Sequence, residues 1–287
     1  MRHANHSVSP IPNVVSIAGV DPSGGAGVLA DLKAFSALGA YGCGVIAALT
    51  AQNTQAVTGA HLPPVAFIGE QIDTLFADVR IDAVKLGMLG TADIVRCVAE
   101  RLEHHNAPLV IADPVMVAKS GDHLLAREAV AMVRETLLPR SFMVTPNLPE
   151  AGVMLDCRAP ETVQEMYRAA ERLREALPLT GEHWVLLKGG HLPGDDLVDL
   201  LFDGDRMIEL PARRINTKNT HGTGCTLSSA IAALLPQIPP SPDAVETAVR
   251  RARDYLLHAI AASGRLSVGQ GHGPVHHFHA LWTPPAP

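Results

Sequence analysis

Short apolar runs alternate with longer amphipathic segments along the first two thirds of the chain. The apolar runs are nearly continuous, which is typical of strands buried on both faces of a sheet. They predict strands at 14–18, 45–50, 83–87, 109–112, 142–144 and 184–187. The segments between them predict helices at 26–38, 65–79, 92–104, 126–137 and 160–177. Repeated strand–helix–strand units imply parallel pairing, so we expect a three-layer α/β/α sandwich with a mainly parallel central sheet.

The pattern changes after residue 190. Two apolar runs, 197–202 and 206–210, flank Asp203-Gly204-Asp205 and predict a β-hairpin. Two helices follow at 223–235 and 243–262, separated by a proline-rich linker. No internal repeat or interdomain linker is visible, so we expect one domain over 14–282. The flanking residues predict a disordered or extended segment at 1–13 and a short tail at 283–287.

Composition narrows the class of protein. The 287 residues are 47% hydrophobic, and 23 Lys and Arg against 29 Asp and Glu give a net charge of −6. This balance argues against a nucleic-acid partner, which needs a basic surplus to neutralise phosphates. The four cysteines are far apart, which argues against a structural zinc site. No secretory signal is visible, and the longest apolar run, 45–51, is far too short to span a bilayer, so we expect a cytoplasmic protein with no membrane partner.

Polar residues follow the predicted strands at the point where each strand ends. In an open parallel sheet, ligands bind outside the carboxyl ends of the strands. The residues in these positions are 19–27, 52–54, Met88, 113–115, 145–150 and 188–191. We expect them to share one site, although polar loops also occur without a function. The glycines of 23–27 do not have the spacing of a dinucleotide fingerprint, and could let the backbone approach a small flat ligand closely.

The segment His221-Gly222-Thr223-Gly224-Cys225 carries the sharpest local signal. It directly precedes an apolar helix, whose N-terminal N–H groups and dipole make an anion site. It is not a Walker A loop, because the chain contains no GxxxxGK[ST] motif. A helix N-terminus also lowers a thiol pKa, so Cys225 could accept a proton from an attacking alcohol. The alternative is that Cys225 is a small buried hydrophobic residue.

Charged residues at three strand ends suit phosphoryl transfer. Asp113 and Glu150 are hard ligands for Mg²⁺ that is held largely through water and phosphates. Lys188 could neutralise a transferring phosphate. The alternatives are a helix cap for Asp113 and solvent exposure for Glu150 and Lys188. The histidine-rich segment 272–279 could bind a metal, but capping the end of the fold explains it better.

Taken together, these motifs resemble a known family. Segments 16–27, 51–54, 85–88, 113–115, 145–151, 188–191 and 219–225 occur in the order of the hydroxymethylpyrimidine/phosphomethylpyrimidine kinases of thiamine biosynthesis, within the ribokinase-like superfamily. The resemblance covers about residues 14–282. It implies two successive phosphorylations of 4-amino-5-hydroxymethyl-2-methylpyrimidine, first on the alcohol and then on its monophosphate. It also implies that ATP with Mg²⁺ is the phosphoryl donor and that the partners are small molecules. A homodimer is consistent with the resemblance.

The resemblance assigns roles to individual residues. Gln52 would pair with the pyrimidine, since a carboxamide offers a donor and an acceptor side by side. The other assigned residues are Gly19, Met88 and Val115 in the pyrimidine pocket with Asp31 near it; Gly222, Thr223 and Gly224 in the anion hole, beside Cys225 as the base; Asp113 and Glu150 on the metal side; and Thr145, Asn147, Lys188, Lys218 and Asn219 toward ATP. Two alternatives stay open, a pyridoxal kinase on the same scaffold and a non-catalytic pyrimidine-binding protein.

Overall fold

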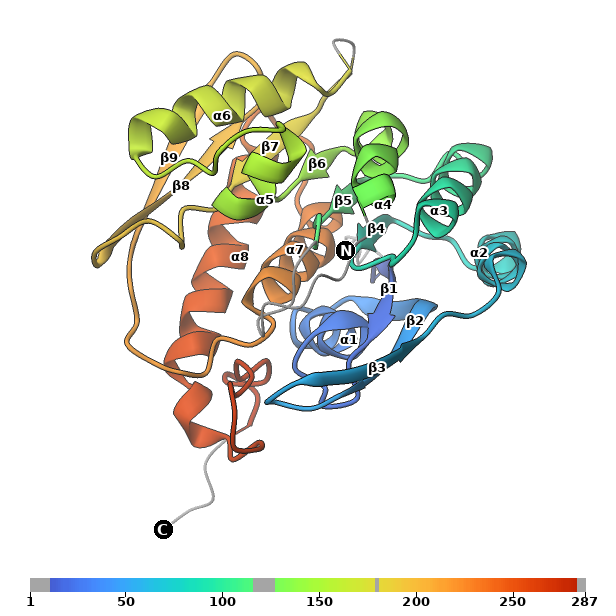
Figure 1. The fold of residues 1–287 in the computed structure, drawn as a ribbon, viewed down its shortest axis with the longest axis horizontal. Coiled ribbons are helices and arrows are strands. Elements are labelled where there is room, and N and C mark those ends of the chain that lie inside the picture. The colour runs from blue at the N-terminus through green and yellow to red at the C-terminus, as the bar shows by residue number, and fades with distance from the viewer. Residues whose placement is uncertain (1–10, 116–126, 179–180, 283–287) are drawn as a thin grey trace, which may run out of the picture.

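A nine-stranded sheet runs through the part of the chain that the computed structural model describes, residues 11–115, 127–178 and 181–282 (Figure 1). Its strand order is β3-β2-β1-β4-β5-β6-β7-β8-β9. The strands are β1 (Asn13–Val20), β2 (Tyr41–Gln52), β3 (Val57–His61), β4 (Ala83–Leu86), β5 (Val110–Ala112), β6 (Met143–Val144), β7 (Trp184–Leu187), β8 (Asp196–Phe202) and β9 (Met207–Arg213). The central pairs are parallel, whereas β3, β8 and β9 pair antiparallel at the two edges.

Helices cover both faces of the sheet, which confirms the predicted three-layer architecture (Figure 1). One face packs on α1 (Gly27–Ala37), α7 (Thr223–Leu234) and α8 (Ala244–Ala261). The other face packs on α2 (Val65–Asp78), α3 (Ala92–His104), α4 (Arg127–Met132), α5 (Leu148–Met154) and α6 (Val163–Glu175). Helix α7 is buried from Thr226 to its end, because it lies between the sheet and its two neighbouring helices.

Two elements were not predicted from the sequence. Strand β3 is an edge strand whose residues are mostly exposed, so it has no apolar periodicity to reveal it. Helix α5 has only seven residues, but it carries a start signal: Asn147 caps it, and Glu150 closes a capping box. The helix predicted at 160–177 is shorter in the structure because Thr162 caps α6.

Other boundaries also differ from the prediction. The helix predicted at 126–137 is regular only to Met132 and continues as a wider helical turn to Leu137. The hairpin strands extend beyond 197–202 and 206–210, and β9 includes Pro211 on the open edge of the sheet. The predictions for residues 1–10 and 283–287 lie outside the described residues.

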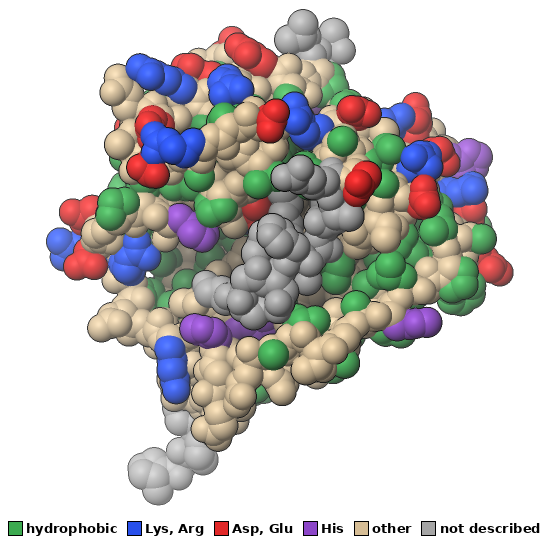
Figure 2. Space-filling model, viewed as in Figure 1, with side chains coloured by type: hydrophobic (Ala, Val, Ile, Leu, Met, Phe, Trp, Pro, Cys, Tyr) green, Lys and Arg blue, Asp and Glu red, His purple; other side chains and the backbone are tan. Residues whose placement is uncertain are grey.

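Charged side chains are unevenly distributed over the surface. Figure 2 shows charged side chains over α6 and α3, few over β2 and β3, and a hollow near the middle of this face. Among the described helices, none combines the length and the apolar character needed to cross a membrane.

A buried ion pair joins four elements beneath the end of β1. The Lys85 ammonium on β4 donates to both Asp31 carboxylate oxygens on α1, at 3.0 and 2.9 Å. Ser16 on β1 and Ser229 on α7 donate to the same carboxylate, each at 2.6 Å. The side chains of Lys85 and Asp31 are fully buried. Burial opposes the charge of Lys85, but the nearby negative groups, Asp31 foremost, raise its pKa above the ordinary value.

We predict that Asp31→Asn lowers the free energy of unfolding by about 3–5 kcal/mol, because it leaves the Lys85 charge buried without its partner. The double variant Asp31→Asn/Lys85→Met should recover most of this loss, since neither side chain is then charged. Urea denaturation measures both. Asp93→Asn is the matched control, because Asp93 pairs with Arg96 in an exposed position and should cost less than about 1 kcal/mol. A loss below about 1 kcal/mol for Asp31→Asn would contradict the argument.

Candidate active site

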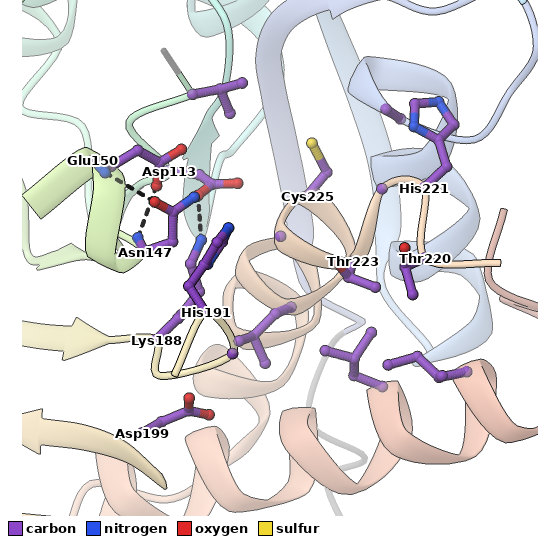
Figure 3. A pocket seen from close by; sticks show the side chains of 18 of the residues that line it. Asp113, Asn147, Glu150, Lys188, His191, Asp199, Thr220, His221, Thr223 and Cys225 are labelled. Carbon is purple, nitrogen blue, oxygen red and sulfur yellow. Dashed lines mark hydrogen bonds and ion pairs between the residues drawn. The ribbon is translucent and has the colours of Figure 1, made fainter. Parts of the chain in front are cut away.

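The carboxyl ends of the parallel strands surround a cavity of about 1290 Å³. Its lining comes from every strand end that the sequence analysis singled out, together with the N-terminus of α7 and one side of α8. Figure 3 shows Asp113, Asn147, Glu150 and Lys188 on one side of this space and Cys225 with His221 on the other. The strand-end residues are therefore brought together, as the parallel sheet requires.

The N-terminus of α7 is built by a close approach of two glycine-containing turns. Gly222 caps the helix with φ of 76°, in the left-handed region. A Cβ at this position would lie 1.8 Å from the carbonyl oxygen of Gly25, so only glycine fits. Among the described residues, the N–H groups of Gly224 and Cys225 have no protein acceptor. Both therefore remain available to an anion at the positive end of the helix.

A lysine–aspartate pair lies beside this helix end. The Lys188 ammonium donates to Asp113 Oδ1 at 2.9 Å, and Ser228 on α7 donates to Asp113 Oδ2 at 3.3 Å. A Cβ on Gly224 would lie 3.3 Å from Lys188 Nζ, which measures how close the pair is to the helix N-terminus. Burial opposes the charge of Lys188, but Asp113 and Glu150 raise its pKa, so the lysine is a cation at neutral pH. The Lys188 side chain is only 13% exposed, which corrects the alternative of a surface lysine.

Glu150 is held in place by the start of α5. Its carboxylate accepts the Asn147 N–H at 2.8 Å, and the Asn147 side chain accepts the Glu150 N–H at 2.9 Å (Figure 3). The Glu150 carboxylate is thus fixed at the cavity wall rather than exposed to solvent, which corrects the alternative of a solvent-exposed Glu150.

The pocket side carries Gln52 at the end of β2. Its Oε1 lies 3.1 Å from the Thr50 hydroxyl, which helps to orient the carboxamide. Gly19 and Met88 pack together next to it, and a Cβ on Gly19 would lie 2.5 Å from the Met88 methyl group. Val115 also lines the cavity. These residues place one carboxamide beside apolar groups in the cavity lining, a combination that suits a small heteroaromatic ring.

A hydrogen-bonded aspartate–histidine pair links the loop after β1 to the loop before α7. Sequence reasoning assigned this pair no role. His221 Nε2 lies 2.6 Å from Asp21 Oδ2, and both side chains are nearly buried. The Asp21 carboxylate also accepts the N–H and hydroxyl of Ser23 and the N–H of Ala26. Burial raises the pKa of Asp21, but the bonds from His221 and Ser23 outweigh it and the pKa is lowered. The signal was present in the sequence, since Asp21 follows the first strand and His221 precedes Gly222.

Comparisons with known proteins agree with this geometry. A family model described as phosphomethylpyrimidine kinase matches residues 21–276. The hydroxymethylpyrimidine/phosphomethylpyrimidine kinase of Escherichia coli (strain K12) is 51% identical over 270 residues, which cover 94% of this chain and 98% of that protein. The chain belongs to the phosphomethylpyrimidine kinase family.

Solved structures confirm that this kinase has the ribokinase-like fold. An ADP complex of Bacillus subtilis pyridoxal kinase is similar with a TM-score of 0.85 and 31% identity, covering 96% of this chain and all of that one. The phosphomethylpyrimidine kinase from Clostridium difficile 630 has a TM-score of 0.72 and 36% identity, covering 85% of this chain and 98% of that one.

Four residues that the resemblance assigned to ligands do not line the main cavity of the kinase. Asp31 lies beneath its wall, where it pairs with Lys85, and Lys85 itself borders the cavity. Thr145 is fully buried and lies 3.2 Å from Asp113 Oδ1. Lys218 and Asn219 line a second, smaller cavity of about 270 Å³ next to residues 263–274.

The histidine-rich segment at the end of the kinase packs against the site. His277 Nε2 lies 3.0 Å from the Thr226 hydroxyl, directly after Cys225. Burial lowers the pKa of His277 to about 3, so this histidine is neutral. Within the described ranges, no three His, Cys, Asp or Glu side chains are placed to share a metal ion. The contact with α7 supports the interpretation of this segment as a cap on the fold.

The expected thiolate at Cys225 is not supported by its surroundings. Burial raises the pKa of the Cys225 thiol to about 11, and the carboxylates of Asp31 and Asp113 act in the same direction. The Lys85 charge and the N–H of Gly27 lower it, but by less. The prediction of a lowered thiol pKa was therefore wrong, because desolvation exceeds the effect of the helix N-terminus.

We predict that iodoacetamide alkylates Cys225 slowly at pH 7 and about tenfold faster for each pH unit up to pH 9.5, because only the thiolate reacts. Mass spectrometry of the Cys225 peptide measures the rate, with the exposed Cys157 in the same digest as the internal control. Far-UV circular dichroism checks that the protein stays folded. A rate that levels off by about pH 9.5 would show an ordinary or lowered thiol pKa and would contradict the burial argument.

Proposed function

We propose that this kinase transfers the γ-phosphoryl group of ATP to the hydroxymethyl group of 4-amino-5-hydroxymethyl-2-methylpyrimidine, and then a second phosphoryl group to the resulting monophosphate, for thiamine diphosphate biosynthesis. The observation that carries the proposal is that Gln52, with the apolar residues beside it, and an anion site at the N-terminus of α7 line one cavity. A protein that only binds the pyrimidine has no use for the second feature.

The transfer itself needs positioning and charge stabilisation more than covalent help. The hydroxymethyl oxygen attacks the γ-phosphorus while the bond to the ADP oxygen breaks, and the hydroxyl proton leaves. The N–H groups of Gly224 and Cys225, with the Lys188 ammonium, stabilise the charge on the transferred group. We propose Cys225 as the group that accepts the proton; its raised pKa leaves little thiolate at neutral pH, so its contribution is smaller than that of the anion site.

The nucleotide fits the end of the cavity between the β8–β9 hairpin and α8. Leu197 and Ile215 line one side of this end, and Leu256, Leu257 and Ile260 line the other. An apolar slot of this kind suits a purine base. From there the phosphates would pass Asn147 and Lys188 to reach the anion site.

The donor set near the phosphates fits Mg²⁺. Asp113 and Glu150 both line the cavity, and carboxylates with phosphate oxygens and water are the ligands that this ion prefers. We propose that these two residues hold the ion that accompanies ATP. When bound, it would neutralise charge on the phosphates, whereas Lys188 would keep its own contact with Asp113.

A pyridoxal kinase activity is the second candidate, because the similar Bacillus subtilis structure is a pyridoxal kinase. Identity favours the pyrimidine, since 51% with the Escherichia coli enzyme exceeds 31% with the pyridoxal kinase. Both compounds are flat heteroaromatic alcohols, so the shape of the pocket separates them poorly.

A substrate panel tests the proposal. The pyrimidine alcohol, its monophosphate and pyridoxal are incubated separately with MgATP, and the products are resolved by mass. We expect conversion of both pyrimidines with a kcat/KM well above that for pyridoxal. Turnover of pyridoxal alone, or of no compound, would contradict the proposal.

We predict that Gln52→Ala raises the KM for the pyrimidine by about ten- to a hundredfold, because the ring loses a paired donor and acceptor. Basal ATP hydrolysis should remain nearly unchanged, since Gln52 lies on the acceptor side. Gln55→Ala is the matched control, because Gln55 is exposed in the adjoining turn. Unaltered pyrimidine kinetics in Gln52→Ala would remove this residue from the site.

A further inference from the structure

An ion pair lies at the nucleotide end of the cavity, outside the residues used above. Arg253 Nε on α8 donates to Asp199 Oδ2 on β8 at 2.9 Å. Both side chains line the cavity, yet only 11% and 17% of their surfaces are exposed. In a largely buried ion pair each side chain neutralises the other, so removal of one leaves the other charge uncompensated.

Asp199 also holds the loop that begins at Lys188. Its second oxygen, Oδ1, accepts the N–H of Gly189 at 2.8 Å. A Cβ on Gly189 would lie 1.9 Å from the carbonyl oxygen of Val198, so the loop lies directly against β8. Figure 3 shows Asp199, in the middle of β8, below Lys188 and His191. The position of Asp199 therefore fixes the backbone next to the Lys188 ammonium.

Arg253 is anchored on its other side as well. One of its terminal nitrogens donates to the carbonyl of Leu210 on β9 at 2.6 Å. The guanidinium thus connects α8 with β8 and β9, the elements that line the apolar slot. A second arginine, Arg214, donates to the carbonyls of Gly190, Leu192 and Gly194 and fixes the rest of the same loop.

Arg253 also neutralises one of the carboxylates at this end of the cavity. Among the described residues, five carboxylates line the cavity, those of Asp21, Asp113, Glu150, Asp195 and Asp199, and Arg213 and Arg214 line it as well. A nucleoside triphosphate brings several more negative charges. Asp113 is compensated by Lys188 and Asp21 contacts His221. Arg253 is the cation paired with Asp199, so without it an unpaired carboxylate would face the phosphates.

We propose that Asp199 and Arg253 are positioning residues for the nucleotide: Asp199 fixes the Lys188–Gly189 loop, and Arg253 cancels the charge of Asp199 where the polyphosphate passes. The proposal rests on the nucleotide placement given under the proposed function. It predicts that an unpaired Asp199 is worse for ATP binding than the loss of both charges.

Four variants test this prediction: Arg253→Met, Asp199→Asn, the double variant Asp199→Asn/Arg253→Met, and the control Arg250→Met. Arg250 lies on the same helix and pairs with Glu246 in an exposed position. Calorimetry with a non-hydrolysable ATP analogue and Mg²⁺ measures the Kd, and steady-state kinetics measure the KM for ATP and for the pyrimidine. The Kd does not depend on the phosphoryl acceptor, so a failure of the pyrimidine assignment would not affect this readout.

We expect Arg253→Met to weaken nucleotide binding about tenfold or more, and the double variant to recover to within about threefold of the unmodified protein. Asp199→Asn keeps an oxygen that can accept the Gly189 N–H, so it should change the Kd less than Arg253→Met. The KM for the pyrimidine should change less than about twofold in all four variants, including the control. If Arg253→Met does not fold, Arg253→Gln replaces it, because glutamine removes the charge but keeps an N–H for the Leu210 carbonyl.

Three results would overturn the proposal. One is an unchanged Kd in Arg253→Met, or in Arg253→Gln where that variant replaces it. A second is a double variant at least as impaired as the single variant at residue 253. The third is an equal rise in the KM for ATP and for the pyrimidine, which would indicate a general structural role.

Discussion

The site depends on the contact between the Gly25 carbonyl and Gly222, which are almost 200 positions apart in the chain. A side chain at residue 222 would lie 1.8 Å from that carbonyl, so glycine there allows α7 to begin against the loop that follows β1. The Asp21–His221 hydrogen bond closes the same junction from the side. This approach places the free N–H groups of α7 opposite the pocket that ends in Gln52.

The same junction explains why the Cys225 thiol stays protonated at neutral pH and is therefore a poor general base. The helix N-terminus and Lys85 favour the thiolate, whereas the packing that brings the two loops together removes water from the sulfur. Desolvation is the larger effect. We therefore propose that catalysis relies chiefly on the oriented N–H groups and on Lys188, whose pKa is raised by Asp113 and Glu150. The buried Lys85–Asp31 pair supports this arrangement from beneath, because it ties α7 to β1 and β4.

Sequence reasoning predicted the architecture where burial imposes a period, and it failed where burial is absent. The central strands are buried on both faces and appear as apolar runs, whereas the exposed edge strand Val57–His61 does not. The convergence of Gln52, Asp113, Glu150 and Lys188 followed from parallel pairing alone. The surroundings of Cys225, the burial of Asp31 and the second cavity next to Lys218 depend on tertiary packing between distant segments, which local patterns do not encode.

The most direct measurement is a crystal structure with a non-hydrolysable ATP analogue, Mg²⁺ and the pyrimidine alcohol bound together. The account predicts the γ-phosphate within hydrogen-bond distance of the Gly224 and Cys225 N–H groups, the hydroxymethyl oxygen directed at its phosphorus, and the pyrimidine amino edge against Gln52. A pyrimidine bound away from Gln52, or phosphates that do not reach the start of α7, would contradict it.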